Sequence, residues 1–158
     1  AASVQTGERL PRAWLKGTLD FSFSGLKTAT MQRAQLLGIY PKKGEDPRRP
    51  EDIDKTHQMN IAAGFQEAIV DVLVSKTLDA AKLYQAKGLI LGGGVAANSV
   101  LRAEMERKSA IPVLVPRPAL CTDNGAMVAA AAYYSKVRLI KPSKTFLSQD
   151  VIPQLRLG

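Results

Sequence analysis

The spacing of apolar and polar positions divides the first half of the chain into two helical segments and a loop. Apolar residues recur three or four positions apart between Ile53 and Tyr84, which predicts a long, mostly buried helix. Another helical pattern begins near Ser24. Residues 40–52 contain three prolines and eight charged side chains, so this stretch is expected to be a loop.

The second half alternates short apolar runs with helical patterns. Residues 89–91 predict a buried strand that ends in the turn Gly92–Gly94, and a helix is expected over about 97–108. A second strand at 111–115 and an alanine-rich helix over 123–136 follow. This order predicts an α/β sheet whose ligand site lies beyond the strand ends. The tail, residues 139–158, has no clear period and is expected to be irregular.

Length and composition favour one globular domain. The chain has 158 residues, of which 46% are hydrophobic, and no uncharged apolar run reaches the roughly 18 residues that a membrane-spanning helix needs. No export signal is visible, and a single cysteine, Cys121, leans toward a reducing compartment, so we expect the cytoplasm. Because the first residue is not Met, we expect the chain to begin inside a longer one.

The net charge of +8 favours an anionic partner, with nucleic acid as the leading candidate and a solvated basic surface as the alternative. Lysines and arginines contact phosphates without reading base sequence. The candidate phosphate contacts are Lys42, Lys43, Arg48, Arg49, Arg102, Arg107, Lys108 and Arg117.

The glycine turn is the first candidate site. Three glycines after a strand allow positive φ angles and close approach of a ligand, and the next helix directs its amide groups at the turn. A phosphate or nucleoside fits, and a packing turn is the alternative. Asn98 either caps that helix or offers its amide to the ligand. The segment matches neither the dinucleotide-binding nor the P-loop pattern.

Two charged residues at helix starts are further candidates. Lys27 lies in the first turn of a helix that Ser24 could cap, where a cation invites an anionic partner or is simply exposed. Asp123 is either a helix cap or a functional carboxylate. A metal site needs more ligands, and His57, expected near the surface, is the only histidine in the chain. Cys121 is expected to be a small buried residue because no activating neighbour is evident.

Three motifs in order resemble the C-terminal half of the tRNA threonylcarbamoyladenosine transferases, some of which were formerly labelled O-sialoglycoprotein endopeptidases. They are Asp-Phe-Ser-Phe-Ser-Gly-Leu-Lys-Thr at 20–28, Gly-Gly-Gly-Val-Ala-Ala-Asn-Ser at 92–99 and Cys-Thr-Asp-Asn-Gly-Ala-Met at 121–127. The resemblance implies one lobe of an actin-like ATPase (ribonuclease H-like) fold, an α/β lobe in which helices, one of them long, pack on a mixed sheet. Residues 1–158 are then a single C-terminal lobe of a two-lobed enzyme.

The resemblance also implies a reaction. Members of this family are acyltransferases that move a threonylcarbamoyl group from threonylcarbamoyl-AMP to N6 of adenosine 37 in tRNAs reading codons that begin with A. Asn98, with Gly93 and Gly94 beneath the nucleotide, is then the residue that holds the adenylate, or ATP. Asp123 matches an aspartate that binds iron or zinc. The other ligands of that ion are two histidines of the N-terminal half, which this sequence does not contain.

The resemblance further implies tRNA and partner proteins, including a paralogous subunit, as the macromolecules that the enzyme meets. The lobe alone is expected to be catalytically incomplete and to self-associate through an exposed interlobe face. Two alternatives stay open: a sugar-kinase-like or other actin-like ATPase lobe, and a non-catalytic module that binds tRNA or a partner protein.

Overall fold

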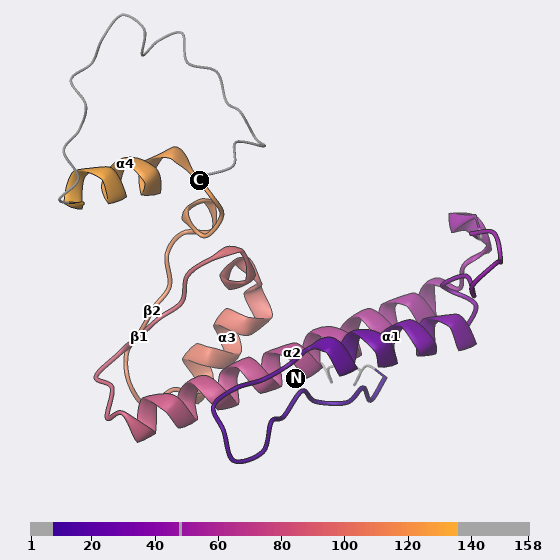
Figure 1. Ribbon diagram of the computed structural model, residues 1–158, viewed down its shortest axis with the longest axis horizontal. Coiled ribbons are helices and arrows are strands. Elements are labelled where there is room, and N and C mark those ends of the chain that lie inside the picture. The colour runs from indigo at the N-terminus through magenta and orange to yellow at the C-terminus, as the bar shows by residue number, and fades with distance from the viewer. Residues whose placement is uncertain (1–7, 48, 136–158) are drawn as a thin grey trace, which may run out of the picture. The chain divides into compact units, whose positions relative to one another are not determined.

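The structure, a computed structural model, describes residues 8–47 and 49–135 and divides into two compact units, 1–122 and 123–158. The helices of the first unit are α1 (Ser24–Leu36), α2 (Lys55–Leu83) and α3 (Ser99–Lys108), and its strands are β1 (Leu89–Ile90) and β2 (Val113–Leu114). Short 3-10 turns occupy Pro50–Asp52, Gly94–Ala97 and Pro118–Leu120, and the second unit holds α4 (Gly125–Tyr134) (Figure 1). Over the described ranges, no helix is both long and apolar enough to cross a membrane.

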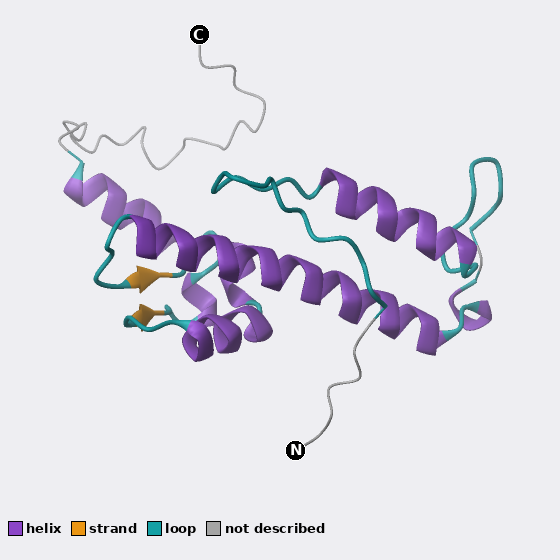
Figure 2. Ribbon diagram, turned by 90° about the horizontal axis from the view of Figure 1, so that it is seen from below, coloured by secondary structure: helices purple, strands orange, loops and turns teal. Residues whose placement is uncertain are grey.

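Helix α2 is the long helix that the apolar spacing predicts, and the first unit is built around it. Asp54 ends the preceding loop as the N-cap, because its Oδ1 accepts hydrogen bonds from the backbone nitrogens of Thr56 at 2.7 Å and His57 at 3.3 Å. Figure 2 shows α1 lying along α2, in agreement with the contacts between these two helices. Residues 40–47 and 49 of the predicted loop contain no helix or strand, as expected, and a 3-10 turn occupies Pro50–Asp52.

Two clusters of apolar side chains cover α2. Val70 and Val74 of α2 pack with Leu101 and Met105 of α3, and residues of both strands complete this cluster. Ala68 belongs to the other cluster, with Leu10 from the N-terminal segment and Leu26 of α1. The central turns of α2 are therefore buried against two different partners, which agrees with the prediction of a mostly buried helix.

The segment that precedes α1 is tied to α2 by polar contacts. Arg12 forms an ion pair with Asp71, with Nη2 and Oδ2 2.7 Å apart, and the buried Lys76 donates to two backbone carbonyl groups of the same segment. Gly64 allows the closest approach, because a Cβ there would overlap the carbonyl oxygen of Glu8. These contacts fix the path that leads into α1.

The strand, helix, strand, helix order is confirmed, with β1 and β2 parallel and α3 as their crossover. Leu89 pairs with Val113 and Ile90 with Leu114. Leu89 and Val113 pack against the α2–α3 cluster, whereas Ile90 and Leu114 are 78% and 64% exposed. The prediction of a buried strand is therefore wrong for one face, because successive side chains alternate and the described residues cover one face only.

Helix starts differ from the predicted ones by one or two residues. Ser24 is the first residue of α1 rather than its cap; Phe23 occupies the cap position, and its carbonyl oxygen accepts from the Lys27 nitrogen at 2.9 Å. In the second unit Asn124 caps α4, with Oδ1 3.0 Å from the Met127 nitrogen. The tail 139–158 lies outside the described residues.

Candidate functional site

The glycine turn connects β1 to α3 through a 3-10 turn. Gly93 has φ +82° and ψ 171°, a conformation that favours glycine, and its carbonyl oxygen accepts from the Ala96 nitrogen at 3.0 Å. Gly92 and Gly94 do not have positive φ. Of the three glycines, Gly93 alone therefore adopts a positive φ.

Packing does not explain the other two glycines. At Gly92, Gly93 and Gly94 a Cβ would meet no atom of the described structure within 4 Å, in contrast to Gly64, and all three residues of the turn are exposed. The same open space is found at Gly17, Gly25, Gly44 and Gly125. Bare backbone facing open space is compatible with a ligand that approaches the main chain.

Asn98 lies at the N-cap of α3, as its spacing predicts. Its Oδ1 accepts from the Leu101 nitrogen at 3.0 Å, and its Nδ2 donates to Oε1 of Gln66 on α2, also at 3.0 Å. A carboxamide has two donor hydrogens and two acceptor lone pairs. One of each therefore stays available to a ligand after both contacts.

Gln66, which precedes Asn98 by 32 residues, was not among the predicted site residues. The sequence does contain a feature that points to Gln66. This residue lies four positions after Ala62 and three before Ile69, so it is a polar residue on a helix face that is otherwise apolar. The two amides line one surface pocket of about 300 Å³. The rest of its lining is apolar: Ala62, Phe65, Ile69, Val70, Val95 and Leu101.

Cys121 is buried, as predicted, and has a cationic neighbour that the sequence did not reveal. Nη2 of Arg102 is 3.0 Å from its Sγ, and Nε of Arg102 donates to the carbonyl oxygen of Ala96 at the end of the glycine turn. Arg102 therefore joins this turn to the end of the first unit. It is held by internal contacts and does not form part of a free basic surface.

Lys27 is exposed in the first turn of α1, which contains no acidic residue. Across residues 8–47 and 49–135 its ammonium group has no ion-pair partner. Gly93, Gly94 and Asn98 lie in one segment and form the candidate site, whereas no described contact joins Lys27 to them.

Asp123 begins the second unit as an exposed residue next to the true cap, Asn124. Since Asn124 accepts the capping hydrogen bond, the capping interpretation of Asp123 is wrong. The described part of the chain holds no group of three His, Cys, Asp or Glu residues able to bind a metal. Asp123 fits as one oxygen ligand, and a metal there needs further ligands from elsewhere.

His57 is half-exposed beside Asp54, which agrees with the predicted surface position. Hydrogen bonds from the backbone nitrogens of His57 and Thr56 lower the pKa of the Asp54 carboxyl below its ordinary value. These contacts stabilise the N-terminus of α2.

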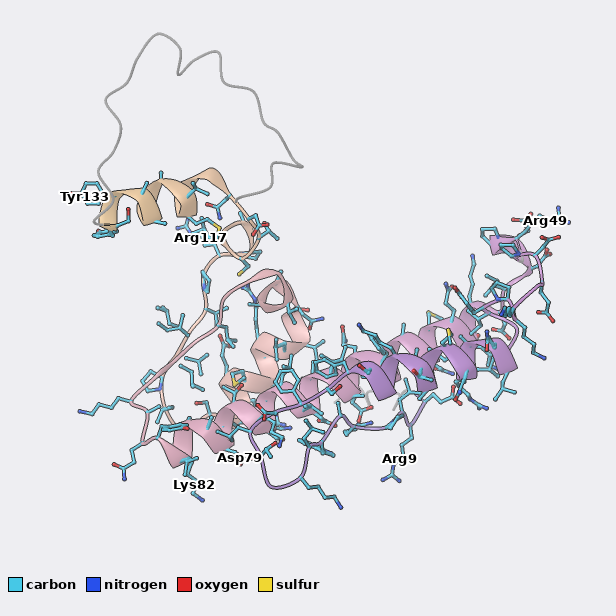
Figure 3. All side chains as sticks on the ribbon, viewed as in Figure 1. Arg9, Arg49, Asp79, Lys82, Arg117 and Tyr133 are labelled. Atoms are coloured by element: carbon cyan, nitrogen blue, oxygen red, sulfur yellow. The ribbon has the colours of Figure 1, made fainter. Side chains whose placement is uncertain are left out.

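The predicted basic contacts fall into two groups. Arg107 and Lys108 are paired with Glu104, and their hydrogen bonds lower its pKa to about 2; Arg49 is close to Glu51 and Asp52. Among the other predicted contacts, Lys42, Lys43 and Arg117 are exposed and lack an ion pair within the described ranges. Arg117 is labelled in Figure 3. Arg48 lies outside the described residues.

Strand β1, the open glycine turn and the asparagine-capped α3 define an α/β protein with a candidate ligand site where a strand leads into a helix. A family model described as tRNA N6-adenosine threonylcarbamoyltransferase matches residues 1–130. The chain belongs to this family, and the resemblance carried by its three motifs is confirmed.

Curated relatives agree with the family assignment. The chain is 42% identical over 146 residues to the tRNA N6-adenosine threonylcarbamoyltransferase of Dehalococcoides mccartyi, covering 92% of the chain and 39% of the relative. Relatives of the same name from Moorella thermoacetica and Desulfitobacterium hafniense are 44% and 48% identical, each covering 94% of the chain and 40% of the relative. The chain thus spans about two fifths of the length of these relatives.

Proposed function

We propose that the full-length protein carrying this sequence is a cytoplasmic enzyme that transfers a threonylcarbamoyl group from threonylcarbamoyl-AMP to N6 of adenosine 37 in tRNAs reading codons that begin with A. The observation that carries the proposal is the glycine turn, where bare backbone faces open space at the start of a capped helix. In the reaction the N6 nitrogen attacks the carbamoyl carbonyl carbon, the bond to the phosphate oxygen breaks, AMP leaves, and the nitrogen loses a proton.

The chain's own residues bind and orient the adenylate in this proposal. Asn98 contributes its remaining amide donor and acceptor, while the main chain at Gly93 and Gly94 lies beneath the nucleotide. Lys27, exposed and without an ion-pair partner in the described structure, offers a cation for an anionic group. Parallel strands joined through α3 are compatible with one lobe of an actin-like ATPase fold.

Asp123 is proposed as one ligand of a divalent metal ion, iron or zinc, whose other ligands come from the rest of the enzyme. Two observations support this role: Asp123 is exposed, and a different residue, Asn124, caps α4. Within the described ranges the Asp123 carboxylate therefore does not serve as a helix cap. When bound, such an ion supplies Lewis-acid polarisation of a carbonyl or phosphoryl oxygen.

The test is Asp123→Ala in the full-length protein with its partner proteins, using threonylcarbamoyl-AMP and tRNA. We expect transfer, followed by mass spectrometry of tRNA nucleosides, and bound metal, measured by elemental analysis, to fall together. Asp79→Ala is the matched control, since Asp79 is an exposed carboxylate on α2 (Figure 3). If Asp123→Ala leaves both metal content and transfer intact, the metal assignment is wrong.

Binding of tRNA is the second part of the proposal, supported by the net charge of +8 and by exposed cations such as Lys42, Lys43 and Arg117. Filter binding across a salt series should show affinity falling steeply as salt rises. Partner proteins, including a paralogous subunit, complete the reaction in this view. Salt-sensitive tRNA binding without transfer in the fully reconstituted enzyme would favour the non-catalytic alternative.

A further inference from the structure

A hydrogen bond between Gln66 and Asn98 joins α2 to the start of α3, in the pocket that both residues line. Nδ2 of Asn98 is 3.0 Å from Oε1 of Gln66, and both residues are partly buried. The other residues that line this pocket of about 300 Å³ are apolar. A polar pair in such surroundings has few alternative partners, so its geometry is specific.

The two hydrogen bonds of Asn98 select one orientation of its carboxamide. The cap requires Oδ1 to face the Leu101 nitrogen, and the Gln66 contact requires Nδ2 to face an acceptor on α2. Rotation of the amide by 180° would place donor against donor at Leu101 and acceptor against acceptor at Gln66. The cap and the Gln66 contact therefore favour the same orientation, and the Gln66 contact reinforces the direction of the remaining donor.

We propose that Gln66 is a positioning residue that holds the Asn98 amide in the orientation that binds the adenylate. This inference rests on the proposed function, in which Asn98 contacts that ligand. Gln66 itself acts through Asn98. Loss of its acceptor lets the Asn98 side chain turn away without removing the residue that touches the ligand.

Gln66→Leu in the full-length enzyme removes the acceptor at similar size. We expect KM for threonylcarbamoyl-AMP to rise about tenfold, the effect of losing one well-placed hydrogen bond, while kcat changes less than about threefold. ATP binding followed by calorimetry should weaken in parallel. Gln58→Leu, an exposed position on the same helix, is the matched control and should leave KM unchanged.

Charged replacements give a test that also works if Gln66→Leu does not fold. Glutamate keeps an acceptor for Nδ2 of Asn98, whereas lysine has only donors. Gln66→Glu should therefore keep KM within about threefold of the parent, and Gln66→Lys should raise it by about tenfold or more. A simple effect of charge on an anionic ligand gives the opposite order, with lysine binding better than glutamate, and that order would overturn the inference.

Failure of this inference is distinguishable from failure of the proposed function. If the parent enzyme shows neither transfer nor ATP binding, the proposed function is wrong. If the parent is active and Asn98→Ala raises KM while Gln66→Leu does not, Asn98 binds the ligand without help from Gln66, and only the positioning role is wrong.

Discussion

Helices α3 and α4 have the same length and the same kind of cap but different surroundings. Each has 10 residues and begins after an asparagine whose Oδ1 lies 3.0 Å from the backbone nitrogen three positions on. Helix α3 buries Leu101 and Met105 against α2, whereas no residue of α4 is buried. Local sequence is therefore enough to start a helix, and packing on a partner decides how much that helix contributes to stability.

The composition of α4 sharpens the contrast. Its residues 125–134 are Gly-Ala-Met-Val-Ala-Ala-Ala-Ala-Tyr-Tyr, without a single charge, and Tyr133 and Tyr134 are 79% and 82% exposed. A helix that is apolar all round normally lies inside a larger structure. The relatives are about two and a half times as long as the region that matches this chain.

Core truncation should separate the two helices most strongly. Leu101→Ala or Met105→Ala leaves a cavity between α3 and α2 and should lower the free energy of unfolding by about 2–4 kcal/mol. Val128→Ala on α4 should change it by less than about 0.5 kcal/mol, because that side chain is 68% exposed. Urea unfolding followed by circular dichroism measures both. Equal losses would show that α4 is packed as firmly as α3.

Self-association is the next largest effect. The isolated chain exposes apolar side chains on α4 and on one face of the sheet, so we expect sedimentation velocity to show dimers or larger species at rising concentration. Val128→Glu should weaken association at least about tenfold, or about 1.4 kcal/mol. Ala103→Glu on the exposed side of α3 is the control. A monomer at every concentration would contradict the expectation.

Removing the two caps compares them directly. Asn98→Ala should cost about 1–2 kcal/mol of unfolding free energy, because the cap is lost and Gln66 loses its donor. Asn124→Ala should cost about 0.5–1 kcal/mol. Thermal or urea unfolding of each variant gives the values. A loss at Asn98 no larger than that of a single cap, about 1 kcal/mol, would mean that the contact with α2 adds nothing.

Local features of the fold followed from the sequence, and long-range ones did not. The apolar period of α2, the strand and helix order and the cap at Asn98 all depend on residues within a few positions of one another. Ile90 is exposed because its face of the sheet has no packing partner in the described residues. A local sequence pattern does not show which face of a sheet is covered. The predicted N-caps Ser24 and Asp123 each differ by one residue from the N-caps in the structure, Phe23 and Asn124. Neighbouring residues at a helix start can occupy the same cap position, so the sequence does not separate them.

The candidate site divides in the same way. Gly93, Gly94 and Asn98 were predicted as site residues because one short segment carries all three, and the three motifs identified the family. Gln66 and the Arg102–Cys121 contact were missed because 32 and 19 residues separate the partners. Sequence spacing says nothing about which turns of α2 meet the start of α3. Such pairs become visible only when the packing of the helices is known.

The smallest difference concerns pH. Hydrogen bonds from Arg107 and Lys108 hold the pKa of Glu104 at about 2, below its ordinary 4.5, whereas α4 has no ionisable residue before its two tyrosines. A lowered pKa in the folded state means that this pairing stabilises α3 above pH 4.5 and is lost as pH falls toward 2. Carbon-detected NMR titration should place the Glu104 midpoint near 2, and Arg107→Gln together with Lys108→Gln should return it toward 4.5. A midpoint at 4.5 in the parent protein would show that these exposed ion pairs do not persist in solution, as is common for surface pairs.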